Sequence, residues 1–477
     1  MENNNNRFGQ QFLFTKETNI PLNWACVNIA DFSLYYHPDL PFTKSVCPKR
    51  TLYMLGSLYD WVEPSQSNQQ LLDKIAGIED FNSFITQLSS YLGEYILIFQ
   101  EDEKFYLFND ATGQQEIYYD SKYTTFGSTT KLLSEIIHTS PHTDQDMINL
   151  YSSNVFKKNK LFVSDTTHLK NVFHLLPNNL IDLNNKVVKR FFPFEKLSKQ
   201  PVNIAAEKAA NMLKGYMKAL AIRKKLAIPF TGGIDSRVLF FASLEEDAIY
   251  YIYKYSYMTD NYHDITTPKL ITTAQNKPFE IIPLTDEYEN LDDSFHFPDK
   301  ILKPTKYFYD RIYLNGNISE LGRALYGTIK NIKASDLAII KGYKASRPAI
   351  KLYEEWLKNS EIFVKNGYHV LDMFNWEQST SILVAKVMAE DNAIGLDTIS
   401  PFNSRELLSL LLSADRKYRD YYDNKLHRAI LLALHPKALD YPINDYSKFK
   451  IKKFFSKLGV YNSIRYFYKR YLMKNAN

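Results

Sequence analysis

The residues best suited to chemistry in this chain are the six from Thr231 to Ser236, which read Thr-Gly-Gly-Ile-Asp-Ser. We call this run the glycine loop. Two adjacent glycines permit positive φ and let backbone N–H groups approach a ligand that a Cβ would block. Asp235 and Ser236 are residue types that begin helices, and a helix N-terminus adds further unpaired N–H groups. The glycine loop therefore suits phosphate, with Mg²⁺ between that anion and the Asp235 carboxylate.

The same six residues also suit a plain strand-to-helix turn, because Gly-Gly before Asp-Ser is common turn chemistry. The apolar run 226–230 predicts a short strand before the turn, and the apolar residues that follow Asp235 predict a helix after it. No Gly-Lys-Ser/Thr follows the glycines, so the run is not the Walker-type loop that grips β- and γ-phosphates. On these residues alone, the phosphate site and the plain turn both stay open.

Three further groups could take part in chemistry, and each has a plainer interpretation. Residues 314–323 form a Gly turn that opens a helix with Glu320 in its first turn, where a carboxylate also favours the helix dipole. Glu377 follows a Trp, and such a pair on a helix is typical of a packed ring beside a solvated charge. Arg405 is either a ligand for a substrate carboxylate or phosphate, or the charge of an exposed helix.

Composition narrows the class of protein. The 477 residues, 45% hydrophobic and 23% charged, are typical of a globular chain of two or three domains. A net charge of +5 is too small to indicate nucleic acid as a partner. Two cysteines, Cys26 and Cys47, provide neither a disulfide framework nor a metal cluster, which favours a reducing, cytoplasmic location. No membrane span or apolar leader is expected. The basic end, 448–474, is either an amphipathic helix near an anionic surface or a packed, solvated helix.

The pattern of strands and helices divides the chain at about residue 195. Residues 1–195 alternate as short strands, with strands expected at 91–99, 105–108 and 117–119. Residues 196–477 begin with a long helix from 202 to 224, after which helices alternate with strands at 226–230, 248–255 and 279–283. This alternation predicts an α/β domain with a doubly wound parallel sheet, in which ligands lie at the carboxyl ends of the strands. From about residue 340 the chain is expected to be helical.

The glycine loop resembles the Ser-Gly-Gly-x-Asp-Ser signature of the PP-loop ATP pyrophosphatases, as found in asparagine synthetase and β-lactam synthetase. Residues 314–323 are similar to the Ser-Gly-x-Gly-Ala-Asp-Glu loop of that family. In this register Gly316 matches the family's glycine and Glu320 matches its metal-binding Asp. Asn317 stands where the family has a catalytic Glu or Tyr. We call residues 315–320 the second loop.

The resemblance implies an ATP-dependent amide-forming ligase. In such enzymes a substrate carboxylate attacks the α-phosphorus of ATP and releases pyrophosphate. Ammonia or an amine then attacks the acyl-adenylate and releases AMP. The residues implied to bind ATP are Thr231, Gly232, Gly233, Asp235, Ser236 and Gly316. Asp235 and Glu320 are implied to hold Mg²⁺. Glu377 falls near the register of a proton-abstracting Glu in β-lactam synthetase.

Two departures from the family limit what the resemblance implies. Residues 435–444 are similar to a family stretch that ends in a transition-state Lys, but Asn444 stands at that position, and Lys448 is the candidate to replace it. Residues 1–195 resemble the N-terminal Ntn-glutaminase β-sandwich of asparagine synthetase. The nucleophilic Cys at position 2 is replaced by Glu2, so this domain is expected not to hydrolyse glutamine.

The predicted substrates are a small-molecule or peptide carboxylate and an amine or ammonia, without nucleic acid, and with a homodimer as an open alternative. Two other functions fit the same nucleotide loop. One is a peptide macrocyclase of the lasso-cyclase type. The other is a non-catalytic relative that binds nucleotide or a partner. RNA modification by a PP-loop enzyme would need a basic RNA-binding module, and none is evident in the sequence.

Overall fold

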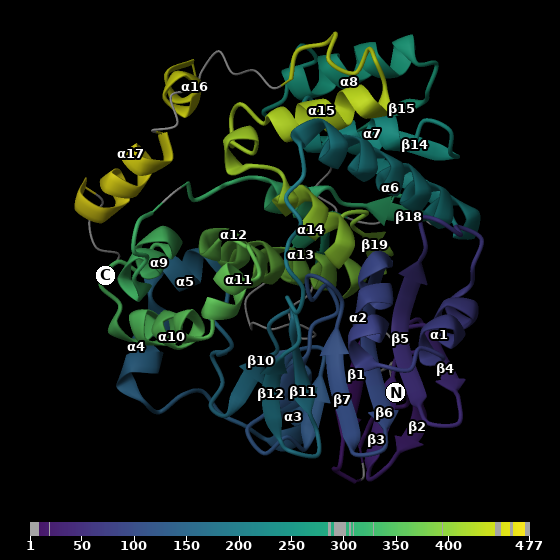
Figure 1. Cartoon of the computed structure of the whole chain (residues 1–477), viewed down its shortest axis with the longest axis vertical. Coiled ribbons are helices and arrows are strands. Elements are labelled where there is room, and N and C mark those ends of the chain that lie inside the picture. The colour runs from purple at the N-terminus through teal and green to yellow at the C-terminus, as the bar shows by residue number, and fades with distance from the viewer. Residues whose placement is uncertain are drawn as a thin grey trace.

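The computed structural model describes residues 9–18, 20–284, 288–290, 302–304, 307–308, 310–327, 329–393, 395–443, 450–457 and 461–472. Antiparallel sheets form the N-terminal half, and a parallel sheet lies in the C-terminal half (Figure 1). The predicted order of these two kinds of sheet along the chain is confirmed. The predicted boundary at residue 195 lies between the last strand of the first half and the long helix that opens the second.

The N-terminal half is a sandwich of two six-stranded sheets. The first sheet has the order β10-β8-β9-β1-β3-β2 and consists of β1 (Phe12–Thr15), β2 (Ala25–Ile29), β3 (Phe32–Tyr36), β8 (Tyr118–Asp120), β9 (Thr125–Gly127) and β10 (Val172–His174). The second has the order β12-β11-β7-β6-β5-β4 and consists of β4 (Phe42–Val46), β5 (Thr51–Tyr59), β6 (Leu92–Glu101), β7 (Lys104–Asn109), β11 (Asn179–Asp182) and β12 (Val187–Arg190). Alternate residues of facing strands form the core between the sheets, where the Phe14 and Phe32 rings stack at 4.5 Å.

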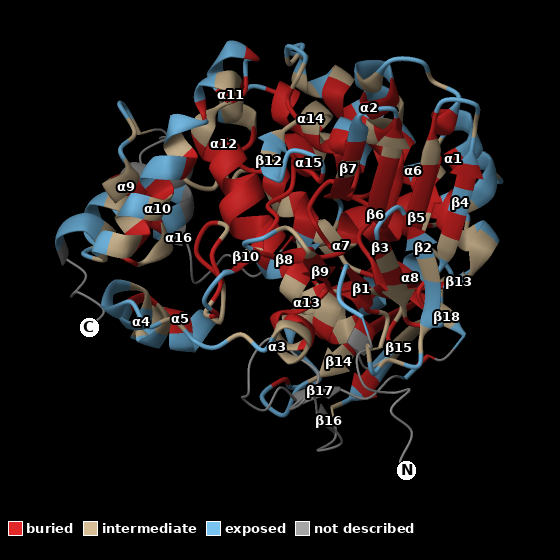
Figure 2. Cartoon of the chain, turned by 90° about the horizontal axis from the view of Figure 1, so that it is seen from below, coloured by how far each residue is buried: buried red, intermediate tan, exposed pale blue. Residues whose placement is uncertain are grey.

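Short helices cover this sandwich. They are α1 (Asn68–Ala76), α2 (Phe81–Ser90), α3 (Thr130–Ile137), α4 (Gln145–Ser152) and α5 (Asn154–Asn159). Helix α1 begins at a capping box in which Ser67 and Gln70 satisfy each other's backbone N–H groups. Its apolar face and that of α2 pack on the outer face of the second sheet, through Leu72 and Phe84 among others. In Figure 2 the strands β5, β6 and β7 are therefore buried, whereas the outer face of α1 is exposed.

The C-terminal half contains a five-stranded parallel sheet of order β15-β14-β13-β18-β19. Its strands are β13 (Lys225–Pro229), β14 (Ala248–Lys254), β15 (Phe279–Pro283), β18 (Arg311–Leu314) and β19 (Thr398–Ile399), and β16 (Tyr288–Asn290) pairs separately with β17 (Leu302–Pro304). The strands predicted at 226–230, 248–255 and 279–283 are confirmed. The chain runs from β13 outward to β15 and then returns to place β18 on the other side of β13. The carboxyl ends of β13 and β18 therefore meet where the direction of winding reverses, which is where parallel sheets bind ligands.

Helices complete the second half. Those that precede or follow β13, β14, β15 and β18 are α6 (Val202–Arg223), α7 (Ile234–Ala242), α8 (His263–Ala274) and the 3₁₀ helix η2 (Asn317–Gly322). The rest are α9 (Ala334–Lys341), α10 (Arg347–Lys358), α11 (Glu361–Lys365), α12 (Val370–Asn375), the π-helical turn η3 (Trp376–Thr380), α13 (Ser381–Ala393), α14 (Arg405–Ser413), η4 (Arg416–Tyr418), α15 (Lys425–Leu434), α16 (Lys450–Lys457), α17 (Tyr461–Phe467) and η6 (Tyr468–Leu472). Helices α6, α7 and α15 pack together on the face of the sheet that carries Leu226 and Ile228. Among the described residues, no helix has the length and apolar character needed to cross a membrane.

Candidate functional site

The glycine loop joins β13 to α7 and is closed by its own hydroxyl groups. The Thr231 N–H donates to Ser236 Oγ at 3.1 Å, and the two hydroxyl oxygens lie 3.0 Å apart. The Gly233 N–H donates to Thr231 Oγ1 at 3.2 Å. Because the two ends of the loop bind each other, α7 begins directly after the turn, at Ile234. The predicted strand, turn and helix start are confirmed.

The reason for the glycine at position 232 is steric rather than conformational. Neither glycine of the loop is among the glycines with positive φ, and Gly233 has φ −73°. A Cβ on Gly232 would instead lie 2.5 Å from His263 Nε2 and 3.0 Å from Asp264 Oδ1. The positive φ that the glycines permit is therefore not used at this loop, where Gly232 instead permits the close approach of α8.

The N-terminus of α8 closes the glycine loop from outside. The Asp264 carboxylate accepts a hydrogen bond from the Gly232 N–H at 2.9 Å. A backbone N–H of the loop thus binds a negatively charged oxygen, which is the chemistry predicted for phosphate. In this structure the anion belongs to the chain itself, so a phosphate at this N–H would have to displace Asp264.

The second loop meets the glycine loop at Asp235. It follows β18, so the sheet brings it to the edge at which β13 ends. A Cβ on Gly316 would lie 3.6 Å from Asp235 Cβ, and Ser319 Oγ donates to Asp235 Oδ1 at 2.5 Å. The two groups predicted to act together are therefore in contact, although β14 and β15 separate them in the sequence.

An arginine that the sequence did not single out joins both predicted metal-binding carboxylates. Arg323 Nη2 contacts the two Asp235 carboxylate oxygens at 2.6 and 2.5 Å, and its Nη1 lies 3.7 Å from Glu320 Oε1. The guanidinium also lies over the Tyr421 ring, 5.1 Å from its centre. Asp235 and Glu320 converge on one cationic group, as predicted for these carboxylates, but that group is a side chain of this chain.

Burial and charge shift the titration of these groups in different directions. Burial raises the pKa of the Asp235 carboxyl, but the charge of the Arg323 guanidinium and the hydrogen bonds donated to the carboxylate together lower it by more, so its pKa lies below the ordinary value. Burial raises the pKa of Glu320, and the negative charge of the neighbouring Asp235 raises it as well. His427 of α15 is fully buried 3.9 Å from Asp235, and burial lowers its pKa to about 4. At neutral pH the group beside the Asp235–Arg323 pair is thus an uncharged imidazole.

The ligands around Asp235 fit Mg²⁺ in kind. Hard oxygen ligands suit this cation, and the Asp235 and Glu320 side chains are 30% and 37% exposed. In the described part of the chain no group of three or more His, Cys, Asp or Glu could hold a metal ion. Mg²⁺ would therefore need further oxygens from the phosphates that it accompanies, and it would compete with Arg323 for Asp235.

The structure assigns no role to the remaining residues predicted beside the nucleotide. Asn317 is exposed, and its backbone N–H donates to Asn315 Oδ1 at 2.8 Å. Asn317 lies in the second loop, as expected. Among the described residues, no contact of its side chain indicates a role. Lys448 and Asn444 lie outside the described residues.

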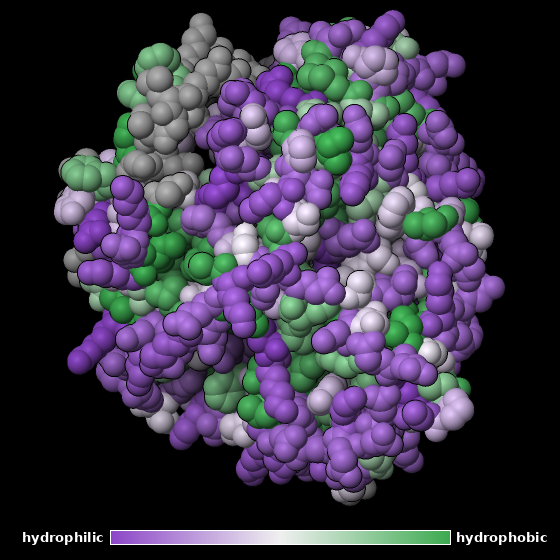
Figure 3. Space-filling view, in the orientation of Figure 1, coloured by the Kyte–Doolittle hydropathy of each residue, from purple (hydrophilic) through white to green (hydrophobic). Residues whose placement is uncertain are grey.

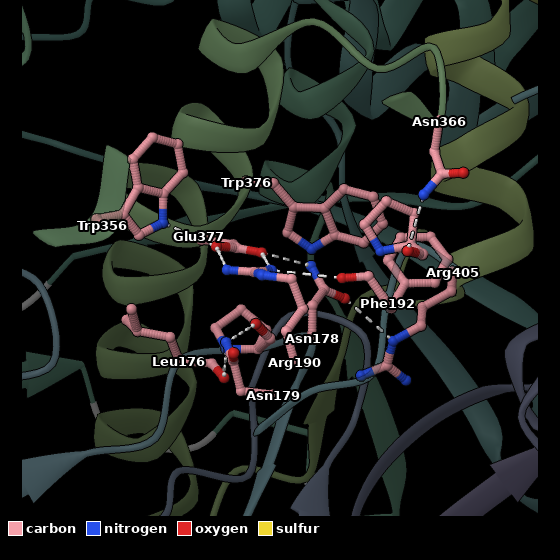
Figure 4. Close-up of polar contacts among 12 residues, drawn as sticks. Leu176, Asn178, Asn179, Arg190, Phe192, Trp356, Asn366, Trp376, Glu377 and Arg405 are labelled. Carbon is pink, nitrogen blue, oxygen red and sulfur yellow. Dashed lines mark hydrogen bonds and ion pairs between the residues drawn. The ribbon is translucent and has the colours of Figure 1, made fainter. Parts of the chain in front are cut away.

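Glu377 is not arranged as a proton acceptor. Its carboxylate is fully buried and binds Arg190 at 2.5 and 2.9 Å, the Trp356 indole N–H at 2.9 Å and the Asn178 amide at 3.2 Å (Figure 4). These four donated hydrogen bonds, two of them from the Arg190 guanidinium, leave no lone pair of the carboxylate directed at a ligand. Both earlier interpretations, catalytic base and solvated charge, are corrected: Glu377 joins the C-terminal half to Arg190 of the other half.

Arg405 also joins the two halves rather than facing a substrate or solvent. It is 2% exposed and donates to Asn178 Oδ1 and to the backbone oxygens of Asn109 and Asp110. Asn403 nearby donates to Asp110 Oδ1 at 2.9 Å. Both interpretations of Arg405 are therefore wrong, because the N-terminal half packs against the start of α14 and buries this side chain.

Two cavities lie between the halves, with volumes of about 610 and 450 Å³. The first is lined by the segment 192–200 together with α2, α6 and α14, and the second by Arg190, Trp356 and neighbours. Neither lining includes a residue of the glycine loop or the second loop. The candidate site at Asp235 therefore rests on the convergence of the two loops and not on a cavity.

The comparisons with known proteins add little to this geometry. No protein-family model matches the chain, and no curated protein matches it. Among solved structures, glutamine phosphoribosylpyrophosphate amidotransferase from B. subtilis, complexed with ADP and GMP, matches 66% of this chain and 72% of its own at 9% identity and a TM-score of 0.24. A likeness of that extent indicates nothing about what this chain binds.

Four residues of the site were missed in the sequence. Ser319 and Arg323 stand in the segment that was singled out, and Arg323 is one helical turn from Glu320, a spacing that could have indicated the contact. Asp264 stands in the first turn of α8, where an acid also favours the helix dipole, so its local sequence does not point to the glycine loop. Nothing in the local sequence of His427 points to Asp235, because α15 reaches the site only through its packing on α6 and α7.

Proposed function

We propose that the chain is an ATP-dependent ligase that adenylates a carboxylate and transfers the acyl group to ammonia or an amine, without glutaminase activity of its own. The observation that carries the proposal is the contact between Asp235 and the second loop at the reversal point of the parallel sheet. A helix N-terminus, a turn with N–H groups that bind an anionic oxygen, and two carboxylates meet there. A PP-loop nucleotide site needs these groups.

The residues have separate roles in this proposal. The β,γ-pyrophosphate is held by backbone N–H and hydroxyl groups of Thr231, Gly232, Gly233 and Ser236. Gly316 lets the second loop lie close to Asp235. Asp235 and Glu320 hold Mg²⁺, which neutralises charge on the pyrophosphate as it leaves. Binding the leaving group more tightly as it separates favours cleavage between the α- and β-phosphates.

Exchange of labelled pyrophosphate into ATP tests the proposal. The purified chain is mixed with Mg²⁺, ATP and a panel of carboxylates that includes amino acids, uronic acids and peptides. Exchange with one class of carboxylate, lost in Asp235→Ala, supports the ligase. Asp31→Ala is the matched control, because Asp31 is an exposed acid paired with Lys16 in the other half. Unchanged exchange in Asp235→Ala refutes the metal role.

A second candidate is a nucleotide-binding protein without ligase activity. It is favoured by one observation: Arg323 binds both carboxylate oxygens of Asp235, the residue that the ligase would need for Mg²⁺. Calorimetric binding of ATP without exchange for any carboxylate would select this function. Glutamate formed from glutamine by the purified chain would contradict the part of the proposal that concerns the N-terminal half.

A further inference from the structure

The C-terminal segment 448–474 has a charge unlike that of the rest of the chain. It contains nine Lys and Arg residues and no Asp or Glu. The remainder of the chain holds 49 basic and 53 acidic residues, so it is slightly acidic overall. The positive charge of the protein is therefore concentrated at this end, which distinguishes a docking feature from an ordinary solvated surface.

One side of α17 and η6 is fixed to the body of the protein. The Tyr466 hydroxyl donates to Asp336 of α9, and Lys469 Nζ donates to the Ile340 backbone oxygen at 2.7 Å. Tyr461, at the start of α17, has its ring 5.0 Å from that of Tyr422. These contacts determine which side of the helices faces outward.

The outward side is apolar. Ile464, Phe467, Tyr468 and Tyr471 are 46%, 57%, 53% and 59% exposed, and their spacing of i, i+3, i+4 and i+7 puts them on one helical stripe. On α16, Ile451 and Phe454 are also largely exposed, with i, i+3 spacing. Figure 3 shows apolar side chains among polar ones on these helices at the upper left. Exposed apolar side chains gathered in this way mark an interaction site.

We propose that the described helices of this end, 450–457 and 461–472, bind the surface of an anionic lipid bilayer, with the apolar stripe in the headgroup region and outward-facing basic side chains such as Arg465 on the lipid phosphates. Aromatic and aliphatic side chains interleaved with Lys and Arg on short helices are the pattern of helices that lie in a bilayer interface. A second copy of the chain is a poorer occupant, because two segments with nine positive charges repel each other. Nucleic acid offers phosphates but no apolar layer for Ile451 and Ile464.

Vesicle sedimentation of the full chain tests this inference. We expect the chain to pellet with vesicles of equal parts phosphatidylcholine and phosphatidylglycerol, to stay in solution with phosphatidylcholine alone, and to be released by salt. Arg465→Gln should weaken binding about fivefold, the effect of one basic residue near an anionic surface. Phe467→Ser with Tyr471→Ser should weaken it by about tenfold or more through the loss of buried apolar area.

Val364→Ser and Ile222→Ser are matched controls, because these side chains are 63% and 52% exposed on α11 and α6. Far-ultraviolet circular dichroism checks that every variant is folded. The inference would be overturned by no sedimentation with anionic vesicles at low salt, by equal binding of the double variant and the controls, or by a lipid-independent dimer that the double variant abolishes. Tighter binding to single-stranded RNA than to vesicles would also overturn it.

Discussion

Arg323 and Asp235 form an ion pair in which one guanidinium nitrogen contacts both carboxylate oxygens, at 2.6 and 2.5 Å. The carboxylate that the sequence assigns to Mg²⁺ thus already has a cation. The same pattern recurs at Gly232, whose N–H binds the carboxylate of Asp264 instead of a phosphate. Both charges that a magnesium nucleotide would bring to this site are supplied by side chains. Nucleotide binding must therefore exchange these partners.

Replacing Arg323 by Met should make the protein more responsive to Mg²⁺. The change leaves Asp235 and Glu320 without their shared cation, so we expect the free energy of unfolding to fall by about 2 kcal/mol in the absence of Mg²⁺. Mg²⁺ should then restore stability by binding the folded state. Thermal unfolding with and without Mg²⁺ measures both effects. Arg190→Met, which breaks the pair with Glu377, is the control that Mg²⁺ should not rescue. An equal response to Mg²⁺ in the Arg323 variant and the unaltered chain would refute the prediction.

Replacing Asp264 by Asn should tighten ATP binding. The amide oxygen can still accept the Gly232 N–H, but the negative charge that repels phosphate is removed. At the effective dielectric constant of a partly buried site, one such charge changes affinity by at least about tenfold. Isothermal titration calorimetry with Mg²⁺–ATP measures this affinity. The control is Asp260→Asn, because Asp260 is an acid nearby that is 90% exposed and paired with Lys254. Weaker binding in Asp264→Asn would show that the carboxylate serves the nucleotide.

The sequence predicted the parallel sheet and the two loops because their signals are local. The apolar run before Thr231, the turn residues and the helical spacing after Asp235 are read within a dozen residues. The order of strands could not be predicted in this way. It follows from packing, and it is what places Gly316 against Asp235.

Partners that come from distant segments escaped prediction for a physical reason. Glu377 looked like a solvated or catalytic acid because its local sequence contains no basic residue, yet Arg190 of the opposite half neutralises it. A charge is buried only where a partner meets it in the folded chain. The same reason explains Arg405, whose acceptors are an asparagine side chain, a tyrosine hydroxyl and two backbone oxygens of the N-terminal half.

Replacing Glu377 by Gln should destabilise the protein without a specific effect on nucleotide binding. The change leaves the Arg190 guanidinium, which is 13% exposed, without its counter-ion, at a cost of about 3 kcal/mol. Urea unfolding measures this cost. The double variant Glu377→Gln with Arg190→Met should lose less free energy of unfolding than the sum of the losses in the two single variants, because either change alone already removes the ion pair. Full stability combined with loss of pyrophosphate exchange would return Glu377 to a catalytic role.

Replacing His427 by Gln should flatten the dependence of stability on pH on the acid side of neutrality. Burial lowers the pKa of this fully buried imidazole to about 4, whereas an ordinary histidine titrates near 6.5. Between these values the unfolded chain takes up a proton that the folded chain refuses, so the free energy of unfolding falls as pH decreases, by about 3 kcal/mol in total. Above pH 6.5 the imidazole is neutral in both states and contributes no slope. Urea unfolding at a series of pH values from neutral to acid measures this slope, and the Gln variant should lack that share of it. Parallel curves for the two proteins would mean that His427 takes up its proton in the folded state as well.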